Sequence, residues 1–374
     1  MPANRKILIY THALTGGGAE RVCALLASGF ACEGCEVILA VDYDCADNAA
    51  YVDPGVRIVV LEKRHHQAIG ALARLLKTEQ PDVSLSALGI SNLKHVLAAA
   101  LAGRLNRAIL SYHGFFSGEP QPLSRLAYLL TPLLTRLAAA TVCVSDSLLQ
   151  VLVGRWRASA RRSLRIYNPV EIRPPDFSAA VPPGRAPMVL AVGRLVPDKN
   201  FAGLVRAIAL LDHGDARLVI LGEGPERAAL EAEVARLGLQ ARVALPGYVS
   251  QPWNYYGQAA CFAMTSKLET FSLVVVEALA NGLPVVSTRC GGPEEILDHG
   301  RYGTLVAFDD AMALARAIDD SLACGGDPAF RRARAAAFGL EAALVAYAKL
   351  FDAVGARAGA IGTPAAAGWG EVPL

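Results

Sequence analysis

The chain alternates short runs rich in valine, isoleucine and leucine with longer segments in which apolar residues recur at helical spacing. Short apolar runs are typical of buried parallel strands, and intervening helical segments indicate a sheet covered on both faces. The first half predicts strands at Lys6–Tyr10, Glu36–Asp42, Val56–Leu61, Val83–Ala87, Ala108–Tyr112 and Ala140–Val144, with helices that include Ala19–Phe30 and Leu93–Ala102.

A proline-rich stretch without apolar periodicity, residues 173–185, is expected to be a linker. The alternation restarts after it, which predicts strands at Met188–Val192, Arg217–Leu221, Val243–Leu245, Cys261–Met264 and Pro284–Thr288, and helices at Asn200–Leu211, Glu226–Leu237 and Phe271–Ala280. The pattern therefore indicates two α/β domains, residues 1–172 and 186–338. A last amphipathic helix is expected at 341–354, followed by an Ala/Gly/Pro-rich tail, 355–374, that we expect to be disordered.

Composition narrows the possible functions. The 374 residues are 53% hydrophobic with a net charge of only +2, which allows large cores and argues against a dedicated nucleic-acid binder. The charge is uneven: residues 1–184 hold 19 basic against 14 acidic residues (+5), and residues 185–374 hold 17 against 20 (−3). No uncharged apolar stretch reaches the length of a membrane span. Eight scattered cysteines without a leader pattern predict a reduced, cytoplasmic protein.

The most informative polar residues are Glu269 and Glu277, which stand at the two ends of an apolar segment. Ionised carboxylates are costly to bury unless polar groups meet them, and the hydroxyls of a sugar nucleotide are such groups. The alternative is two surface acids on a helix that faces solvent. If that helix begins near Phe271, its first amides can bind a phosphate.

Two further segments carry candidate chemistry. Gly16-Gly17-Gly18 follows the first strand and precedes a helix, so its backbone can approach a ligand closely. It is not a dinucleotide fingerprint, and a tight turn without a ligand is the alternative. Arg194 and Lys199 lie five positions apart in a loop that enters a helix, where they can bind phosphate oxygens or remain solvated.

Taken in order, these segments resemble family-4 glycosyltransferases of the GT-B fold, over roughly residues 5–350. The motifs that carry the resemblance are Gly16 to Arg21, Val144 to Ser147, Tyr167 to Val170, Gly193 to Asn200, Gly222 to Pro225, and the Glu269/Glu277 pair. The resemblance implies an α/β fold of two Rossmann-like domains that face a cleft, with a C-terminal helix that can cross back to the first domain. It assigns acceptor binding to the first domain and nucleotide-sugar binding to the second.

The resemblance also implies roles for individual residues. Glu277 would bind the donor ribose, Glu269 the transferred sugar, and Arg194 and Lys199 the diphosphate, while His113 matches a histidine that contacts the sugar near C6. Glu269, His113, Arg194 and Lys199 are therefore the candidate catalytic residues. Donor contacts would further come from Gly17 and Gly18, from Gly247 and Tyr248 beside the base, from Phe271, and from the backbone amides of Ser272 and Leu273 at the phosphates. Ser272 is a departure, because the family often has glycine there.

The implied reaction is transfer of a hexose or N-acetylhexosamine, with retention of anomeric configuration, from a nucleotide diphosphate sugar to a saccharide. UDP-linked donors are the leading expectation and GDP-mannose the next. No cofactor or metal is expected, because protein cations can stabilise the leaving diphosphate; Asp42-Tyr43-Asp44 spells a metal-binding pattern without the other features of such a site.

The acceptor is expected to be lipid-linked, in assembly of a cell-surface polysaccharide or oligosaccharide. The segment Gly154 to Arg165 holds five arginines, and residues 123–139 are leucine-rich, so this region can rest on an anionic membrane at the inner face, or be a solvated basic surface over a core. Two other functions remain open: a sugar-nucleotide epimerase on the same scaffold, and a non-catalytic protein that binds sugar nucleotides.

Overall fold

The computed structural model describes residues 5–45, 47–116, 122–173 and 186–359. It divides into two compact units. Unit 1 comprises Met1–Glu171 and Phe338–Leu374, and unit 2 comprises Ile172–Ala337. Most of the expected linker, residues 174–185, lies outside the described residues.

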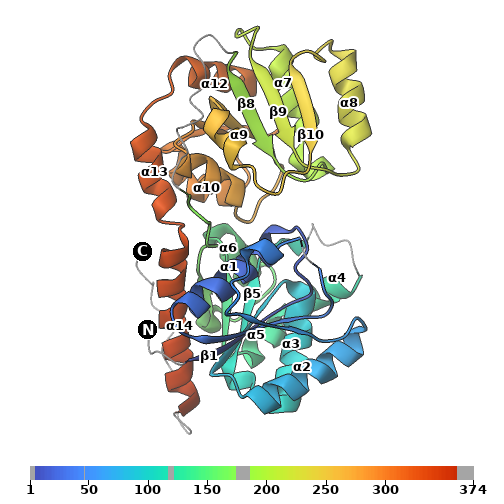
Figure 1. Ribbon diagram of the computed structural model, residues 1–374, viewed down its shortest axis with the longest axis vertical. Helices are drawn as coiled ribbons and strands as arrows, with labels where there is room; N and C mark the ends of the chain where they lie inside the picture. The colour runs from blue at the N-terminus through green and yellow to red at the C-terminus, as the bar shows by residue number, and fades with distance from the viewer. Residues whose placement is uncertain (1–4, 46, 117–121, 174–185, 360–374) are drawn as a thin grey trace. The chain divides into compact units, whose positions relative to one another are not determined.

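Unit 1 contains a parallel sheet with seven strands among its described residues, in the order β3-β2-β1-β4-β5-β6-β7. Strands β1 and β5 of this sheet are labelled in Figure 1. The strands are β1 Lys6–Thr11, β2 Glu36–Val41, β3 Arg57–Val60, β4 Val83–Ala87, β5 Ala108–Tyr112, β6 Ala140–Cys143 and β7 Ser163–Arg165. The α-helices are α1 Gly18–Cys32, α2 His65–Glu79, α3 Gly89–Ala102, α4 Pro122–Leu129, α5 Thr131–Leu137, α6 Asp146–Gly154 and α14 Leu340–Gly359.

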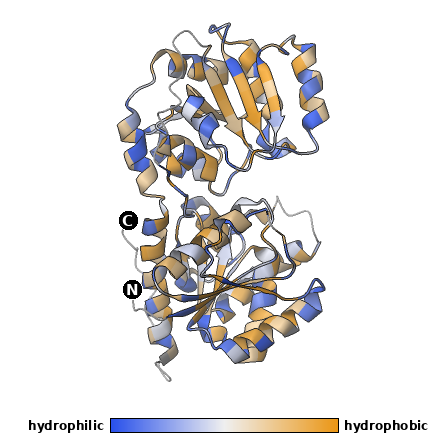
Figure 2. Ribbon diagram, viewed as in Figure 1, coloured by the Kyte–Doolittle hydropathy of each residue, from blue (hydrophilic) through white to orange (hydrophobic). Residues whose placement is uncertain are grey.

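Unit 2 repeats this topology with six strands in the part of it that the structure describes, in the order β10-β9-β8-β11-β12-β13. They are β8 Met188–Val192, β9 Arg217–Leu221, β10 Val243–Gly247, β11 Cys261–Met264, β12 Val285–Thr288 and β13 Thr304–Val306. The α-helices are α7 Phe201–Ala209, α8 Arg227–Arg236, α9 Trp253–Gln258, α10 Leu273–Ala280, α11 Gly292–Ile296, α12 Ala311–Ala323 and α13 Pro328–Ala336. Strands β8 and β9 are largely apolar, whereas α8 alternates polar and apolar positions (Figure 2).

In both sheets the strand order reverses beside the first strand of the unit, between β1 and β4 in unit 1 and between β8 and β11 in unit 2. Two Rossmann-like α/β units with this order form the GT-B fold, as the sequence predicts. Open sheets of this kind bind ligands at the carboxyl ends of the strands, at the point where the order reverses. Ligand binding is therefore expected at the loops that follow β1, β4, β8 and β11.

The C-terminal helix crosses back to unit 1, as expected. The chain re-enters this unit at Phe338, whose carbonyl accepts a hydrogen bond from the Val170 amide at 2.9 Å. Along α14, Phe351 packs against Phe30 of α1 with ring centroids 5.3 Å apart, and Asp352 forms an ion pair with Arg5.

The helix continues to Gly359, so the boundary expected at Gly355 is wrong. Ala356, Arg357 and Ala358 are good helix formers and extend it. The rest of the expected tail lies outside the described residues.

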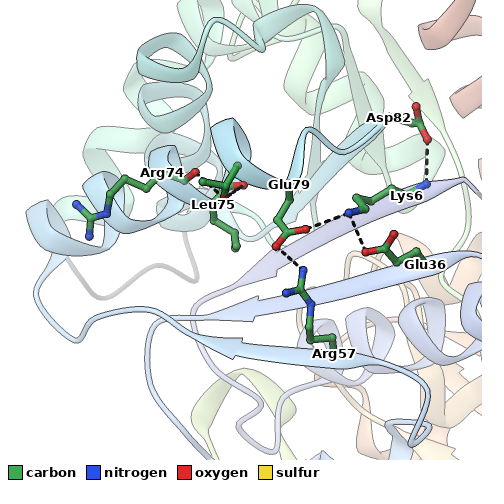
Figure 3. A network of polar contacts seen from close by, with 8 residues as sticks. Lys6, Glu36, Arg57, Arg74, Leu75, Glu79 and Asp82 are labelled. Carbon is green, nitrogen blue, oxygen red and sulfur yellow. Dashed lines mark hydrogen bonds and ion pairs between the residues drawn. The ribbon is translucent and has the colours of Figure 1, made fainter.

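A network of ion pairs links the amino-terminal ends of the unit 1 strands, at the end of the sheet away from the loops named above (Figure 3). Lys6 on β1 contacts Glu36 of β2 at 2.8 Å and Glu79 of α2 at 3.0 Å, and Glu79 also pairs with Arg57 of β3 at 2.6 Å. These groups are partly exposed, so each pair adds little stability. Because the network lies at the amino ends of the strands, we interpret it as structural.

Other sequence predictions differ from the structure in detail. Helix α3 begins at Gly89, four residues before the predicted start, and α10 begins at Leu273 rather than Phe271. The short strands β7 and β13 were not predicted from the sequence, because three residues carry too little periodicity to be told from a loop.

Candidate active site

Loops that follow β8 and β11 bring Lys199 and Glu269 together in unit 2. The Lys199 ammonium forms an ion pair with Glu269 Oε1, and Ser266 Oγ donates a hydrogen bond to the same oxygen at 2.9 Å. The Lys199 carbonyl in turn accepts a hydrogen bond from Thr265 Oγ1 at 2.8 Å. Both charged side chains are partly exposed, at 26% for Lys199 and 17% for Glu269. A cation and a carboxylate are thus held side by side where the strand order reverses, within reach of solvent.

The loop that carries Glu269 is held by a glycine turn after β12. The Glu269 amide donates to the Cys290 carbonyl, and the Gly292 amide donates to the Glu269 carbonyl, both at 2.9 Å. A side chain at Gly292 would place its Cβ 2.5 Å from Phe271 Cα, so only glycine permits this approach. Gly291 has φ +92°, a conformation that also favours glycine. The Gly291-Gly292 turn therefore positions Glu269.

Helix α10 begins directly after this loop. Phe271 is buried, and Ser272 occupies the N-cap position with φ 169°. This is extended backbone that any residue adopts, so serine fits where the family often has glycine. Ser272 Oγ contacts Met264 Sδ at 3.2 Å and does not cap the helix. Since the first amides of a helix have no intrahelical acceptor, those from Leu273 onward can serve an anion.

Glu277 lies one turn further along α10 and is 1% exposed. Its Oε2 accepts a hydrogen bond from the Tyr256 hydroxyl of α9 at 2.8 Å. The structure therefore gives Glu277 a polar partner, separate from the contacts that join Lys199 and Glu269.

Arg194 lies in the loop after β8 and is exposed, with no ion pair to any residue within the described ranges. Its loop packs closely on the turn after β9: a Cβ at Gly222, which has φ +145°, would collide with the Gly193 carbonyl. Gly247, with φ +96°, ends β10, and the next side chain, Tyr248, is 61% exposed. An exposed ring after a strand end is available for stacking.

The remaining predicted site residues belong to unit 1. Gly17 is the N-cap of α1, and Gly18 is its first residue. Their loop is held by side chains, because Asn48 donates to the carbonyls of Thr15 and Gly17, and Thr15 Oγ1 donates to Glu20 at 3.1 Å. The glycine-rich turn is thus a fixed structure rather than a loose connection.

His113 follows β5 and is neutral. Desolvation lowers its pKa to about 4, and its Nε2 is 2.9 Å from Ser111 Oγ. The Ser111 carbonyl accepts from Asn92, which is bonded to Ser86 at 2.8 Å. His95 continues this buried polar chain, with Nδ1 2.9 Å from Ser86 Oγ. A neutral imidazole on such a framework can donate or accept a hydrogen bond at a defined position.

The sequence did not predict a second charged cluster in unit 1, formed by His12, Asp42 and Lys94. The Asp42 side chain has no exposure and accepts hydrogen bonds from His12 at 2.6 Å, Lys94 at 2.5 Å and Tyr10 at 2.8 Å. Asp42 therefore has protein partners where the Asp42-Tyr43-Asp44 pattern suggested a metal. Across the described part of the chain, no group of three or more His, Cys, Asp or Glu residues is arranged to hold a metal ion. Among the helices described, none is both long and apolar enough to cross a membrane.

Comparisons with known proteins agree with this architecture. Residues 16–173 match the model of Glycosyltransferase Family 4, and residues 173–337 match that of Glycosyl transferases group 1. The structure of Anabaena HepE (Alr3699) in complex with UDP and glucose is similar with a TM-score of 0.79, at 21% identity, over 93% of this chain and 99% of that one.

Two curated relatives share part of the sequence. The chain is 36% identical over 141 residues to the lipopolysaccharide core biosynthesis glycosyltransferase LpsE of Rhizobium meliloti, which is 38% of this chain and 41% of LpsE. It is 32% identical over 176 residues to the Campylobacter jejuni N-acetylgalactosamine-N,N'-diacetylbacillosaminyl-diphospho-undecaprenol 4-alpha-N-acetylgalactosaminyltransferase, 46% of this chain and 48% of that enzyme. The matched segments thus span less than half the length of these relatives. With two family models that together extend from residue 16 to residue 337, the chain belongs to the group 1, family 4 glycosyltransferases of the GT-B fold.

Proposed function

We propose that the protein is a retaining glycosyltransferase that moves a hexose or N-acetylhexosamine from a nucleotide diphosphate sugar to a lipid-linked saccharide acceptor, in the assembly of a cell-surface polysaccharide or oligosaccharide. The observation that carries this proposal is the Lys199–Glu269 pair, which lies where the unit 2 strand order reverses and just before the N-terminus of α10.

The two residues of the pair suit the two parts of the donor that separate in the reaction, the diphosphate and the transferred sugar. Expulsion of a nucleoside diphosphate from an anomeric carbon builds negative charge on the β-phosphate, so a cation and uncapped helix amides lower the barrier most if they are in place beforehand. We assign the diphosphate to Lys199, Arg194 and the amides of Ser272 and Leu273. Glu269 can then exchange its lysine partner for hydroxyls of the transferred sugar.

Two further residues are assigned to the nucleoside. We propose that Glu277 binds the ribose while Tyr256 donates a hydrogen bond to its Oε2, and that the exposed Tyr248 after Gly247 stacks beside the base. We propose a UDP-linked donor first, because the similar HepE structure holds UDP and glucose, and GDP-mannose second. In unit 1, the neutral His113 and the amides of Gly17 and Gly18 are proposed to contact the donor sugar and phosphates.

A surface of unit 1 supports a lipid-linked acceptor. Four leucines at helical spacing on α4 and α5 are exposed: Leu126 at 44%, Leu129 at 62%, Leu133 at 54% and Leu137 at 39%. Exposed arginines accompany them at positions 125, 136, 155, 157 and 161. We call this set the leucine–arginine face.

Hydrogen bonds and ring contacts join its parts. Arg136 Nη1 donates to the Arg157 carbonyl at 3.3 Å, and Trp156 packs on Tyr128 of α4 with ring centroids 6.0 Å apart. Residues 122–165 contain seven arginines and one acidic residue, Asp146. Apolar side chains flanked by cations bind anionic lipid headgroups and insert between them. We therefore propose that the face rests on an anionic membrane at the inner side of the cell membrane.

The donor proposal is tested with a panel of nucleotide sugars: UDP-glucose, UDP-galactose, UDP-N-acetylglucosamine and GDP-mannose, with NAD as the negative control. A donor that binds the folded protein raises its melting temperature by mass action. Lys199→Ala should lose this shift and reduce kcat about 10²–10³-fold, as removal of one charge-stabilising donor does. Lys267→Ala is the matched control, because Lys267 is an exposed cation of the neighbouring loop.

The outcomes are distinct. Equal shifts with NAD, or none with any sugar nucleotide, would refute the donor site. NMR of the donor incubated with protein alone reveals isomerisation, which would identify an epimerase instead. If Glu269→Ala and Lys199→Ala leave transfer unchanged, the site is not catalytic.

The membrane proposal is tested by flotation with phosphatidylcholine vesicles, with and without phosphatidylglycerol. Binding should require the anionic lipid and weaken as salt screens the charges. Replacing Leu129 and Leu133 with serine should release the protein, whereas Leu210→Ser, which changes an exposed leucine of unit 2, should not. Binding that survives the leucine changes would assign attachment to another surface.

A further inference from the structure

The cluster of His12, Asp42 and Lys94 lies where the strand order of unit 1 reverses. His12 follows β1, Asp42 follows β2, and Lys94 comes from α3, the helix after β4. The sheet order β2-β1-β4 brings these three carboxyl-end segments next to one another. The Asp42 amide also donates to the His12 carbonyl at 2.9 Å, which fixes the two loops together. The proposed donor site uses none of these side chains.

The exposure of the three residues differs sharply. Asp42 is completely buried and Lys94 is 2% exposed, whereas the His12 side chain is 33% exposed. A buried ion pair is weak as a stabilising device, since apolar residues of similar volume often serve as well. The pair does, however, place a fixed carboxylate under a solvent-accessible imidazole. That arrangement is typical of a histidine that has to be held in one orientation.

The hydrogen bonds determine which nitrogen His12 presents. An ionised Asp42 has no proton to donate, so His12 Nδ1 must carry the hydrogen in the 2.6 Å contact. Lys94 supplies the countercharge that keeps Asp42 ionised. In neutral His12 the other nitrogen, Nε2, is then a hydrogen-bond acceptor. The rings of Tyr43 and His65 lie near the imidazole, with centroids 5.0 and 6.2 Å from that of His12.

The backbone beside the cluster is strained. Leu88, the residue after β4, has φ +78° and ψ 148°, a region occupied almost only by glycine. Such strain concentrates at ligand sites, where the chain is held in a conformation that local preference does not favour. Leu88 precedes α3, the helix that supplies Lys94.

From this geometry we infer that His12 binds the acceptor saccharide: Nε2 accepts a hydrogen bond from an acceptor hydroxyl, while Asp42 and Lys94 are positioning residues that fix the imidazole. The inference rests on the proposed glycosyltransferase function and adds a contact on the acceptor side. It does not make His12 the proton acceptor of the transfer step.

The first test is NMR on the full chain labelled with ¹⁵N-histidine, in which long-range ¹H–¹⁵N correlations distinguish the two neutral tautomers. We expect His12 to carry its proton on Nδ1, with the signal identified by its loss in His12→Asn. Asp42→Asn should abolish this preference. Because that change leaves Lys94 buried without a charge partner and can impair folding, Asp42→Asn with Lys94→Met is the second variant, and it should show the same loss. A His12 that carries its proton on Nε2 in the native protein overturns the inference.

The second test measures transfer of labelled sugar from the donor to a lipid and saccharide extract of the source cells. His12→Asn keeps a group that can reach Asp42 but lacks the outward nitrogen, whereas His12→Gln places a carbonyl oxygen near the position of Nε2. We expect His12→Asn to raise the amount of extract needed for half-maximal rate about tenfold, as loss of one hydrogen bond does. His12→Gln should recover part of it, and the donor KM should not change. His66→Asn, an exposed histidine of α2, is the matched control.

The outcomes separate the two proposals. If the native protein transfers sugar and His12→Asn behaves like it, or if His12→Asn raises the donor KM equally, the acceptor contact is refuted while the glycosyltransferase function stands. If the native protein transfers to nothing in the extract, the proposed function fails and this inference fails with it.

Discussion

Lys94→Met is the most direct test of how unit 1 tolerates charge in its core. Lys94 Nζ lies 2.5 Å from Asp42 Oδ2, and neither side chain is more than 2% exposed. Methionine has a similar length but carries neither the charge nor the N–H donors of lysine. Asp42 would retain its hydrogen bonds from Tyr10 and His12 but lose its nearest cation.

The magnitude follows from burial. Removing one partner of a buried ion pair typically costs about 3–5 kcal/mol, because it leaves an uncompensated charge. For a unit of this size each kcal/mol lowers the melting temperature by about 2–4 °C, so the transition of unit 1 should fall by about 10 °C. The double variant Asp42→Asn with Lys94→Met removes both charges and should be clearly more stable than Lys94→Met.

The pH dependence provides a second signature. Burial by itself raises the pKa of Asp42, but the hydrogen bonds from His12, Lys94 and Tyr10 outweigh it and hold the pKa below its ordinary value. A carboxylate with a depressed pKa stabilises the native state at neutral pH and loses that contribution as pH falls below about 4. Without Lys94 the pKa of Asp42 should rise, so acidification toward pH 5 should narrow the difference between Lys94→Met and the native protein.

The measurement is differential scanning calorimetry of the native protein and the variants across this pH range. Lys77→Met is the control, because Lys77 is exposed on α2 in the same unit. A Lys94→Met protein within about 1 kcal/mol of the native one, or a double variant as unstable as the single one, would refute the reasoning.

Three other changes probe the framework of both units. Gly222→Ala forces a side chain onto a residue with φ +145° and into the Gly193 carbonyl, so the free energy of unfolding of unit 2 should fall by about 1–3 kcal/mol or more. An unchanged calorimetric transition temperature would contradict the close packing of these loops. Tyr256→Phe removes the 2.8 Å hydrogen bond to Glu277 and should raise the donor KM about tenfold, with little effect on the acceptor; an unchanged donor KM would separate Glu277 from the nucleoside. Burial lowers the pKa of His95 to about 3, so below pH 6.5 the unfolded chain binds a proton that the folded chain does not. The free energy of unfolding should therefore fall by roughly 1.4 kcal/mol for each unit by which the pH is lowered. Urea titrations of His95→Gln should lack this slope between pH 6 and 4.

The strands of both sheets were predictable because buried parallel strands are continuous apolar runs. Val83–Ala87, Met188–Val192 and Cys261–Met264 match the structure to the residue. Helix boundaries were less accurate, since α3 begins with Gly89-Ile90-Ser91-Asn92, residues with weak helix propensity that tertiary contacts nevertheless hold in a helix.

The candidate site was predictable only in part. Motif order pointed to Lys199 and Glu269 as members of one site, and their ion pair shows that they lie together. The cluster of His12, Asp42 and Lys94 was not predictable, because Asp42 lies 30 positions from His12 and 52 positions from Lys94 in the sequence. Only the order of the strands brings them together. The sequence likewise gave no sign that Tyr256 contacts Glu277, since a tyrosine in a short helix has many possible partners.

The return of α14 to unit 1 has a consequence for biosynthesis. Arg5 near the start of the chain pairs with Asp352, and Phe30 packs against Phe351. During translation, the residues of unit 1 emerge from the ribosome first, yet the apolar side of α1 stays uncovered until the whole of unit 2 has been made. Contacts between such distant parts of a chain form slowly. The nascent protein therefore passes through an interval in which unit 2 can complete its core while unit 1 still lacks its last helix. Truncation before residue 340 should leave a product that binds chaperones or aggregates.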